Sequence, residues 1–250
     1  LGDWINSRGV SKDLVVIGKA AHTPQCEPKF IRPQILESLD RLNISKIDIF
    51  CLHRDNRDVP VDEFIDALSD IRDEGLIDIF GASNWELDRF SSARAYAIKN
   101  KKEPFSVLSN NFSLAEMIQP VWPGCVGVND RFLEYIISEK ILLFPWSSQA
   151  RGFFIKKKEQ TSNEHFSNPT LDEEMRVWHY EKNLQRREKC FELAEKKSVE
   201  PIQIALAYVL HQSDLIFPLI GPRNLSETNS SIEATKIKLS VKELQELSQD

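Results

Sequence analysis

Glycine is scarce in this sequence, with nine residues in 250. No apolar run is followed by Gly-x-Gly-x-x-Gly, the turn through which open doubly wound sheets approach a dinucleotide. This absence argues against a Rossmann-type fold. Cys-x-x-Cys pairs are absent too, because the four cysteines (Cys26, Cys51, Cys125 and Cys190) stand far apart. Such usage is typical of free thiols in a reducing compartment, and we expect no metal site.

Positive charge is not in excess. The sequence has 32 Lys and Arg against 38 Asp and Glu, which gives a formal net charge of -6. The one dense basic cluster, Lys156 to Lys158, falls in an expected loop. No apolar run approaches membrane-spanning length, and there is no secretory signal. We therefore expect a cytoplasmic protein without a nucleic-acid or membrane partner.

Short apolar runs alternate with segments of helical period. The run from Lys46 to Leu52 is β-branched and aromatic, as in a strand buried on both faces. Further strands are expected at 14–17, 77–80, 105–108, 141–144 and 215–220. Helical spacing marks 33–42, 61–71, 87–97, 131–138, 187–196 and 202–210, and a capping box at Ser240 and Glu243 opens a final helix. Segments 115–130 and 160–180 are expected to be long loops.

About six strand–helix units in series indicate a parallel sheet, and a closed barrel needs eight. We expect an α/β fold, a (β/α)8 barrel of the TIM type, as a single domain over residues 1–250. About two units would then be missing before Leu1. The segment from Leu1 to Ile5 also reads like the end of a helix whose beginning is absent.

Polar residues stand where several strands end. His53 follows the Lys46–Leu52 run, and parallel α/β folds collect their chemistry at the carboxyl ends of strands. Taken alone, His53 is equally well explained as a structural histidine whose ring nitrogens form hydrogen bonds at the edge of the sheet. Lys19 alone is better explained as a strand-end lysine that extends its ammonium to solvent. A functional role for Lys19 and His53 is favoured only if other strand ends carry polar motifs that belong to the same pattern.

Six motifs form such a pattern: Gly18-Lys19, Leu52-His53-Arg54, Gly81-Ala-Ser-Asn84, Phe112-Ser-Leu114, Trp146-Ser-Ser-Gln-Ala-Arg-Gly152 and Ile220-Gly-Pro-Arg223. Their order and spacing resemble those of the aldo-keto reductase superfamily over essentially the whole chain. The resemblance implies a barrel that holds NADPH across the carboxyl ends of its strands. Lys19 and His53 match the lysine and histidine of the family's catalytic set. The family's aspartate and tyrosine are expected upstream of Leu1.

The implied roles follow from the chemistry of carbonyl reduction. Hydride from the nicotinamide adds to a carbonyl carbon while a tyrosine, in this family, protonates the oxygen. Lys19 matches the cation that lowers the pKa of that tyrosine. His53 would orient the carbonyl and stabilise its oxygen.

The resemblance also assigns the nicotinamide contacts. Ser83 and Asn84 match the pair that binds the carboxamide, although Ser83 with Glu86 also fits a capping box for the next helix. Trp146 stands where the family has a tyrosine stacked on the nicotinamide, with core packing as the alternative. Ser109 replaces the usual glutamine and is shorter.

The phosphate contacts lie later in the chain. Ser147, Gln149 and Arg151 match a loop that runs along the pyrophosphate. Arg223 and Asn224 match the residues that meet the adenosine 2′-phosphate, which favours NADP(H), although Asn224 also fits a helix cap with Glu227. Glu227 and Ser231 replace a glutamine and an asparagine near the adenine. A carboxylate at Glu227 is unfavourable beside a phosphate.

The sequence thus predicts an NADP-dependent oxidoreductase acting on an aldehyde, ketone or sugar-like carbonyl. The two long loops contain aromatic residues suited to such a substrate or to surface packing: Trp122, Phe166, Trp178, His179 and Tyr180. Part of the motif set also resembles a subgroup with a fused dehydrogenase domain. The alternatives are a non-catalytic NADPH-binding regulatory module of the same fold and a structural fragment that binds no nucleotide.

Overall fold

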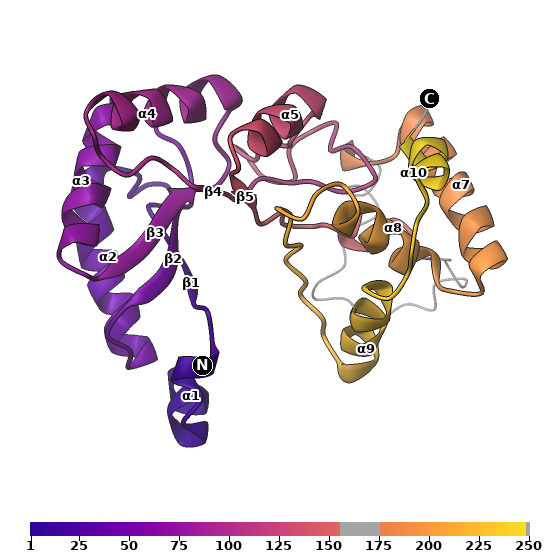
Figure 1. The fold of residues 1–250 in the computed structure, drawn as a ribbon, viewed down its shortest axis with the longest axis horizontal. Helices are drawn as coiled ribbons and strands as arrows, with labels where there is room; N and C mark the ends of the chain where they lie inside the picture. The colour runs from indigo at the N-terminus through magenta and orange to yellow at the C-terminus, as the bar shows by residue number, and fades with distance from the viewer. Residues whose placement is uncertain (156–175, 249–250) are drawn as a thin grey trace. The chain divides into compact units, whose positions relative to one another are not determined.

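The computed structural model describes residues 1–155 and 176–248. The chain forms two compact units (Figure 1). Unit 1 comprises Leu1–Ser109 and Ser138–Leu142, and unit 2 comprises Asn110–Ile137 and Leu143–Asp250. The expectation of a single domain stays a prediction. The expected 156–158 loop and most of the 160–180 loop, with Phe166, lie outside the described residues.

Unit 1 is built on a parallel sheet. Its strands follow chain order: β1 (Ile17–Ala20), β2 (Ile47–Leu52), β3 (Ile77–Ala82), β4 (Val107–Leu108) and β5 (Leu142–Leu143), whose last residue belongs to unit 2. The β5 strand joins through the amide of Leu142, which donates to the carbonyl of Ser106 at 3.0 Å. The β2 strand is buried almost throughout, as its apolar sequence predicts.

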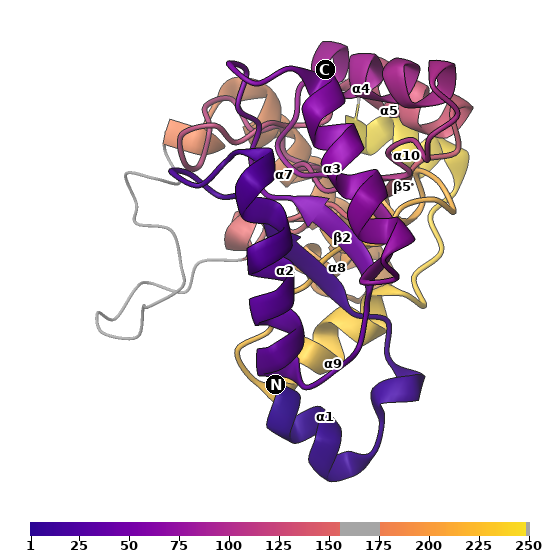
Figure 2. The same cartoon turned by 90° about the vertical axis from the view of Figure 1, so that its left-hand side faces the viewer.

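Helices connect the parallel strands and cover one face of the sheet (Figure 2). They are α2 (Pro28–Leu42), α3 (Val61–Asp73) and α4 (Leu87–Lys99), preceded by α1 (Gly2–Arg8) and a 3₁₀ turn at Ser11–Asp13. The buried face of α3 is Phe64, Ile65, Leu68 and Ile71, the apolar set expected from its spacing. After α3, Gly75 adopts φ 76° and its amide donates to the carbonyl of Arg72, as expected for a glycine that terminates a helix.

Unit 2 is mainly helical. Its helices are α5 (Asp130–Ser138), whose last residue belongs to unit 1, and then α7 (Glu181–Lys197), α8 (Pro201–Leu210), α9 (Leu225–Ala234) and α10 (Val241–Ser248). The α8 helix is buried nearly all round and contacts both α7 and α9. The expected capping box precedes α10, since the Ser240 amide donates to the Glu243 carboxylate at 2.7 Å.

Several element boundaries differ from expectation; the helix expected at 187–196, for example, begins at Glu181. The first strand covers Ile17–Ala20 rather than 14–17, because pairing with β2 runs from Ile17 opposite Ile49 to Ala20 opposite Leu52. Lys19 therefore lies within β1 and not beyond its end. The α2 helix begins at Pro28 and contains Pro33, since the buried Ile31 and Ile35 hold both turns on the core.

The strand expected at 215–220 is reduced to an isolated bridge between Leu143 and Ile216. The Phe217 amide donates to Leu143 and the Leu219 amide to Pro145, at 2.8 and 3.0 Å. Pro145 has no amide hydrogen to donate to the Phe217 carbonyl, so the parallel ladder is interrupted there.

Among the helices that the structure describes, none combines the length and the apolar character needed to cross a membrane.

Candidate active site

The carboxyl ends of β2, β3 and β4 bring three predicted residues into one row. The amide of His53 donates to Ala20 at 2.7 Å, that of Ser83 to Leu52 at 2.6 Å and that of Ser109 to Ala82 at 2.8 Å. Each residue therefore continues the parallel ladder one step past its strand. The row exists because neighbouring parallel strands end at the same edge of the sheet.

Lys19 extends from β1 into this row. Its ammonium donates to the Ser109 hydroxyl at 2.8 Å and lies 3.5 Å from that of Ser83. Burial lowers the pKa of Lys19, with nearby Arg54 acting in the same direction and Cys51 opposing it. The lysine is thus a partly buried cation held by neutral hydroxyls. Such a cation is available to a further anionic or phenolic group.

Ser83 and Asn84 complete the cluster. The Ser83 hydroxyl donates to the Ser109 carbonyl at 2.5 Å, and the Asn84 side-chain amide donates to Ser83 Oγ at 3.0 Å and to the His53 carbonyl at 3.2 Å. Asn84 adopts φ 60°, the left-handed region that asparagine tolerates better than most residues. The capping alternative for Ser83 is wrong, because α4 begins at Leu87 with Glu86 as its N-cap.

His53 is half-buried beside a second imidazole. The His22 ring meets it edge-on, with centroids 4.7 Å apart and an interplanar angle of 78°. Burial lowers the pKa of His53 to about 4, and neighbouring positive groups, Lys19 first, act in the same direction. His53 is therefore neutral near pH 7, with one ring N–H to donate and one nitrogen to accept.

Two residues of this environment were not expected. Arg54 is buried with 8% exposure, and its guanidinium donates to the His53 carbonyl at 3.3 Å. Its position directly after His53 at a strand end was a usable signal. His22 lies in the loop after β1, and nothing in the sequence pattern indicates its contact with His53.

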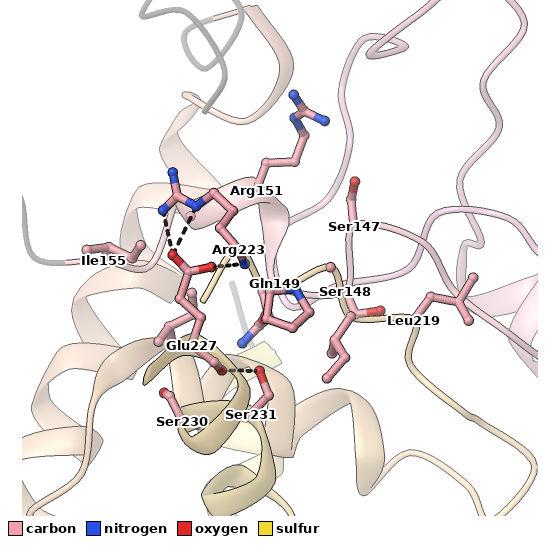
Figure 3. Close-up of a pocket in the computed structure, with 15 residues that line it drawn as sticks. Ser147, Ser148, Gln149, Arg151, Ile155, Leu219, Arg223, Glu227, Ser230 and Ser231 are labelled. Atoms are coloured by element: carbon pink, nitrogen blue, oxygen red, sulfur yellow. Dashed lines mark hydrogen bonds and ion pairs between the residues drawn. The ribbon is translucent and has the colours of Figure 1, made fainter. Parts of the chain in front are cut away.

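Unit 2 contains a cavity of about 410 Å³ (Figure 3). Six of the predicted cofactor residues line it: Ser147, Gln149, Arg151, Arg223, Glu227 and Ser231. Two arginines and several serines in the lining of one cavity suit the oxygens of a phosphate group. Ser148 and Ser230, which were not predicted as site residues, also line it.

Arg223 and Glu227 face one another in this cavity (Figure 3). The Arg223 Nε and Nη2 atoms donate to Glu227 Oε1 at 3.0 and 2.7 Å, and the Arg223 amide donates to Oε2 at 2.8 Å. Asn224 caps α9, because its Oδ1 accepts from the Glu227 amide at 3.0 Å. The capping interpretation of Asn224 is thus confirmed, and Asn224 is not among the residues that line the cavity.

The loop from Ser147 to Gly152 has unusual backbone geometry. Ser147, Ala150 and Arg151 have φ values of 52°, 47° and 51°, which are uncommon for residues other than glycine. Arg151 turns its side chain away from Glu227 (Figure 3) and places its guanidinium carbon 5.1 Å from the Trp122 ring centroid.

Trp146 stands just before this loop and outside the cavity lining. Its ring centroid lies 6.4 Å from that of Trp122 at 39°. Trp122 is half-exposed, whereas the expected pocket residue Trp178 is fully buried, so core packing accounts for Trp178.

The structure thus gathers most of the predicted residues into two groups, to which Trp146 and Asn224 do not belong. The unit 1 group is Lys19, His53, Ser83, Asn84 and Ser109, and the unit 2 cavity has the six residues named above. Within the described residues, no group of three or more His, Cys, Asp or Glu is placed to hold a metal ion.

The parallel sheet with helical connections places the chain among TIM-type α/β folds, and a solved structure supports this. A thermostable aldo-keto reductase in complex with the inhibitor epalrestat matches with a TM-score of 0.71 at 19% identity, covering 99% of this chain and 74% of that one. The family model of the aldo/keto reductase family matches residues 1–249. The chain therefore belongs to the aldo/keto reductase family. That the first two strand–helix units are missing stays a prediction.

Curated relatives agree with this assignment. Probable aldo-keto reductase 1 of Glycine max is 27% identical over 88% of this chain and 59% of its own length. Norsolorinic acid reductase A of Aspergillus parasiticus is 28% identical over 99% of this chain and 62% of its own length, and norsolorinic acid reductase of Aspergillus flavus gives the same values. The chain thus spans about 60% of the length of these relatives.

Proposed function

We propose that this chain is the barrel part of an NADP-dependent oxidoreductase that transfers hydride between NADPH and an aldehyde, ketone or sugar-like carbonyl. The cluster of Lys19, His53 and Asn84 at the strand ends carries the proposal. Two relatives are named as norsolorinic acid reductases, which supports reduction of an organic carbonyl compound without fixing its identity.

The residues of unit 1 suit carbonyl polarisation. Bound NADPH would supply the hydride. Neutral His53 would donate its ring N–H to the carbonyl oxygen, where negative charge develops. Lys19 would stabilise the phenolate of a tyrosine that protonates this oxygen. Ser83 and Asn84 would bind the nicotinamide carboxamide, and Ser109 would hold the Lys19 ammonium.

The residues of unit 2 suit the phosphate groups of the dinucleotide. Arg223 offers a planar guanidinium for the 2′-phosphate, and the serine-rich 147–152 loop offers hydroxyl donors. Arg151 adds a second positive charge to the cavity lining. This cavity is the basis for proposing NADP(H) as the cofactor.

A non-catalytic NADPH-binding module of the same fold is the second candidate, and it requires no tyrosine near Lys19 and His53. Tyr96 is the sole tyrosine in the sequence of unit 1, and its hydroxyl donates to Asp66 at 3.0 Å. This hydrogen bond joins α4 to α3 in the helical layer. Unit 1 thus supplies a lysine and a histidine without a tyrosine as proton donor.

Titration of NADPH into the chain, followed by tryptophan fluorescence, tests the nucleotide-binding part of the proposal. We expect saturable quenching that Arg223→Ala weakens about tenfold, while Arg32→Ala, at an exposed arginine of unit 1, leaves it unchanged. Absence of a saturable change in the wild-type chain would overturn the proposal.

Turnover tests the roles assigned to Lys19 and His53. We expect residues 1–250 alone to show little or no carbonyl reduction, because the proton donor is absent from the motifs they contain. Normal turnover by this chain would contradict the roles assigned to Lys19 and His53. The absence of nucleic-acid and membrane partners, cytoplasmic location, and a fused or associated dehydrogenase domain stay predictions.

A further inference from the structure

Glu227 binds the edge of Arg223 that an arginine ordinarily offers to a phosphate. Two guanidinium nitrogens, Nε and Nη2, converge on Glu227 Oε1 at 3.0 and 2.7 Å. The second carboxylate oxygen accepts from the Arg223 amide at 2.8 Å, and Asn224 Nδ2 lies 3.4 Å from Oε1. The carboxylate therefore takes the donors on which an incoming anion would depend.

We propose that Glu227 is a specificity-determining residue whose carboxylate competes with a 2′-phosphate for Arg223 and thereby reduces the preference for 2′-phosphorylated over unphosphorylated adenine nucleotides. This inference rests on the proposed nucleotide-binding function of the cavity. It concerns the selectivity of that cavity between two chemical classes of nucleotide.

The position of Glu227 makes this competition direct. Glu227 lies in the first turn of α9, and its amide is held by Asn224 Oδ1 at 3.0 Å. The backbone under the carboxylate is thus fixed close to Arg223. The side chains of Arg223 and Glu227 are 43% and 36% exposed, so the ion pair is partly hydrated and open to exchange.

The two nucleotide classes meet the carboxylate differently. A phosphate brings negative charge toward Glu227, which repels it. It also accepts hydrogen bonds from the same guanidinium donors, so it competes with Glu227 for them. A ribose hydroxyl carries no charge and donates a hydrogen bond to a carboxylate. Glu227 therefore disfavours the phosphorylated ligand selectively.

Calorimetric titration of the whole chain with 2′,5′-ADP and with 5′-AMP tests the inference. We expect the wild-type chain to bind both, with affinities within about tenfold of each other. Glu227→Gln removes the charge but keeps an acceptor for the Arg223 amide. We expect this variant to bind 2′,5′-ADP about five- to tenfold more tightly and 5′-AMP within about twofold of wild type.

The chain offers a matched control in Arg32 and Glu74. Arg32 Nε and Nη2 donate to the Glu74 carboxylate at 2.8–3.1 Å, and the two side chains are 51% and 40% exposed. Glu74→Gln removes the same charge from a similar Arg–Glu pair in unit 1. It should leave both affinities unchanged.

A double variant tests whether the effect passes through Arg223. In an Arg223→Ala background, Glu227→Gln should raise the 2′,5′-ADP affinity by less than half the factor seen with Arg223 present. The same factor in both backgrounds would overturn the proposed competition. Glu227→Ser is measured alongside with the same expectation, so that misfolding of one variant leaves the test intact.

The remaining outcomes are distinguishable. If both nucleotides bind but the Glu227 variants leave their affinity ratio unchanged, the inference is wrong and the proposed function stands. If neither nucleotide binds wild type or any variant, the nucleotide-binding proposal fails and this inference fails with it.

Discussion

The Lys19 ammonium lies 2.8 Å from the hydroxyl oxygen of Ser109, although two strands separate β1 from β4 in the sheet. The same ammonium is the largest charge effect among those that lower the pKa of His53. Lys19 therefore couples the ends of the strands electrostatically.

Replacing Lys19 with methionine should raise the pKa of His53 above its value of about 4. The reason is that removal of a nearby positive charge makes protonation of the imidazole easier. The rise should be partial, because burial also lowers this pKa. An NMR pH titration of the His53 ring resonances measures it. Lys12→Met, at an exposed lysine outside the cluster, is the control, and an unchanged His53 pKa in Lys19→Met would show that the two groups are uncoupled.

Acidification should destabilise the fold through His53. The folded-state pKa of about 4 lies below the ordinary value of 6.5. Between pH 4 and pH 6.5, His53 is therefore protonated in the unfolded chain and neutral in the folded chain. This contribution to the free energy of unfolding is fully present above pH 6.5 and is lost as the pH falls toward 4. Because His53 is half-buried, solvent screening reduces the size of the effect.

Urea unfolding at several pH values measures this dependence. His53→Gln should flatten the slope between pH 6.5 and 4, whereas His179→Gln, at an exposed histidine of unit 2, should not. An equal slope in wild type and His53→Gln would assign the acid sensitivity to other groups.

Gly81 is required by the close approach of β3 and β4. A Cβ atom at this position would lie 1.7 Å from the Val107 carbonyl oxygen, which belongs to the backbone of the paired strand. Gly81→Ala should therefore lower the free energy of unfolding by at least about 3 kcal/mol and disturb Ser83 and Asn84 just beyond it. Denaturant unfolding checks this.

Gly127→Ala is the matched control for Gly81→Ala. Its added Cβ would meet only ordinary contacts, the nearest at 3.8 Å. We expect a change in unfolding free energy of less than about 1 kcal/mol. Comparable losses in the two variants would contradict the steric argument.

The sequence was most informative where hydrophobic period and burial coincide. The apolar run at 47–52 and the spaced apolar face of α3 are found where they were predicted, because both are buried by their own strand or helix layer. The first strand was predicted three residues early, because Val15 and Val16 have high β propensity while the ladder itself begins at Ile17. The pairing of β1 with β2 decides where the strand begins, and the local amino-acid composition carries no information on this pairing.

The same limit applies to the candidate site. Strand-end positions and the family resemblance were enough to name Lys19, His53, Ser83 and Asn84, which the structure gathers. The contact of His22 with His53 depends on how the loop after β1 folds back. The Arg223–Glu227 pair has the spacing of a helical ion pair, but the convergence of Arg223 Nε and Nη2 on one carboxylate oxygen is visible only in three dimensions.

The side-chain amide of Asn84 reports most directly whether the unit 1 cluster receives the nicotinamide of NADPH beside a carbonyl-polarising histidine. NADPH and 2′,5′-ADP, which lacks the nicotinamide, are titrated separately into the chain while the Asn84 amide signals are followed by NMR. We expect a saturable shift with NADPH and little or none with 2′,5′-ADP. Asn84 signals that stay fixed at saturating NADPH, or that move equally with both ligands, would contradict it.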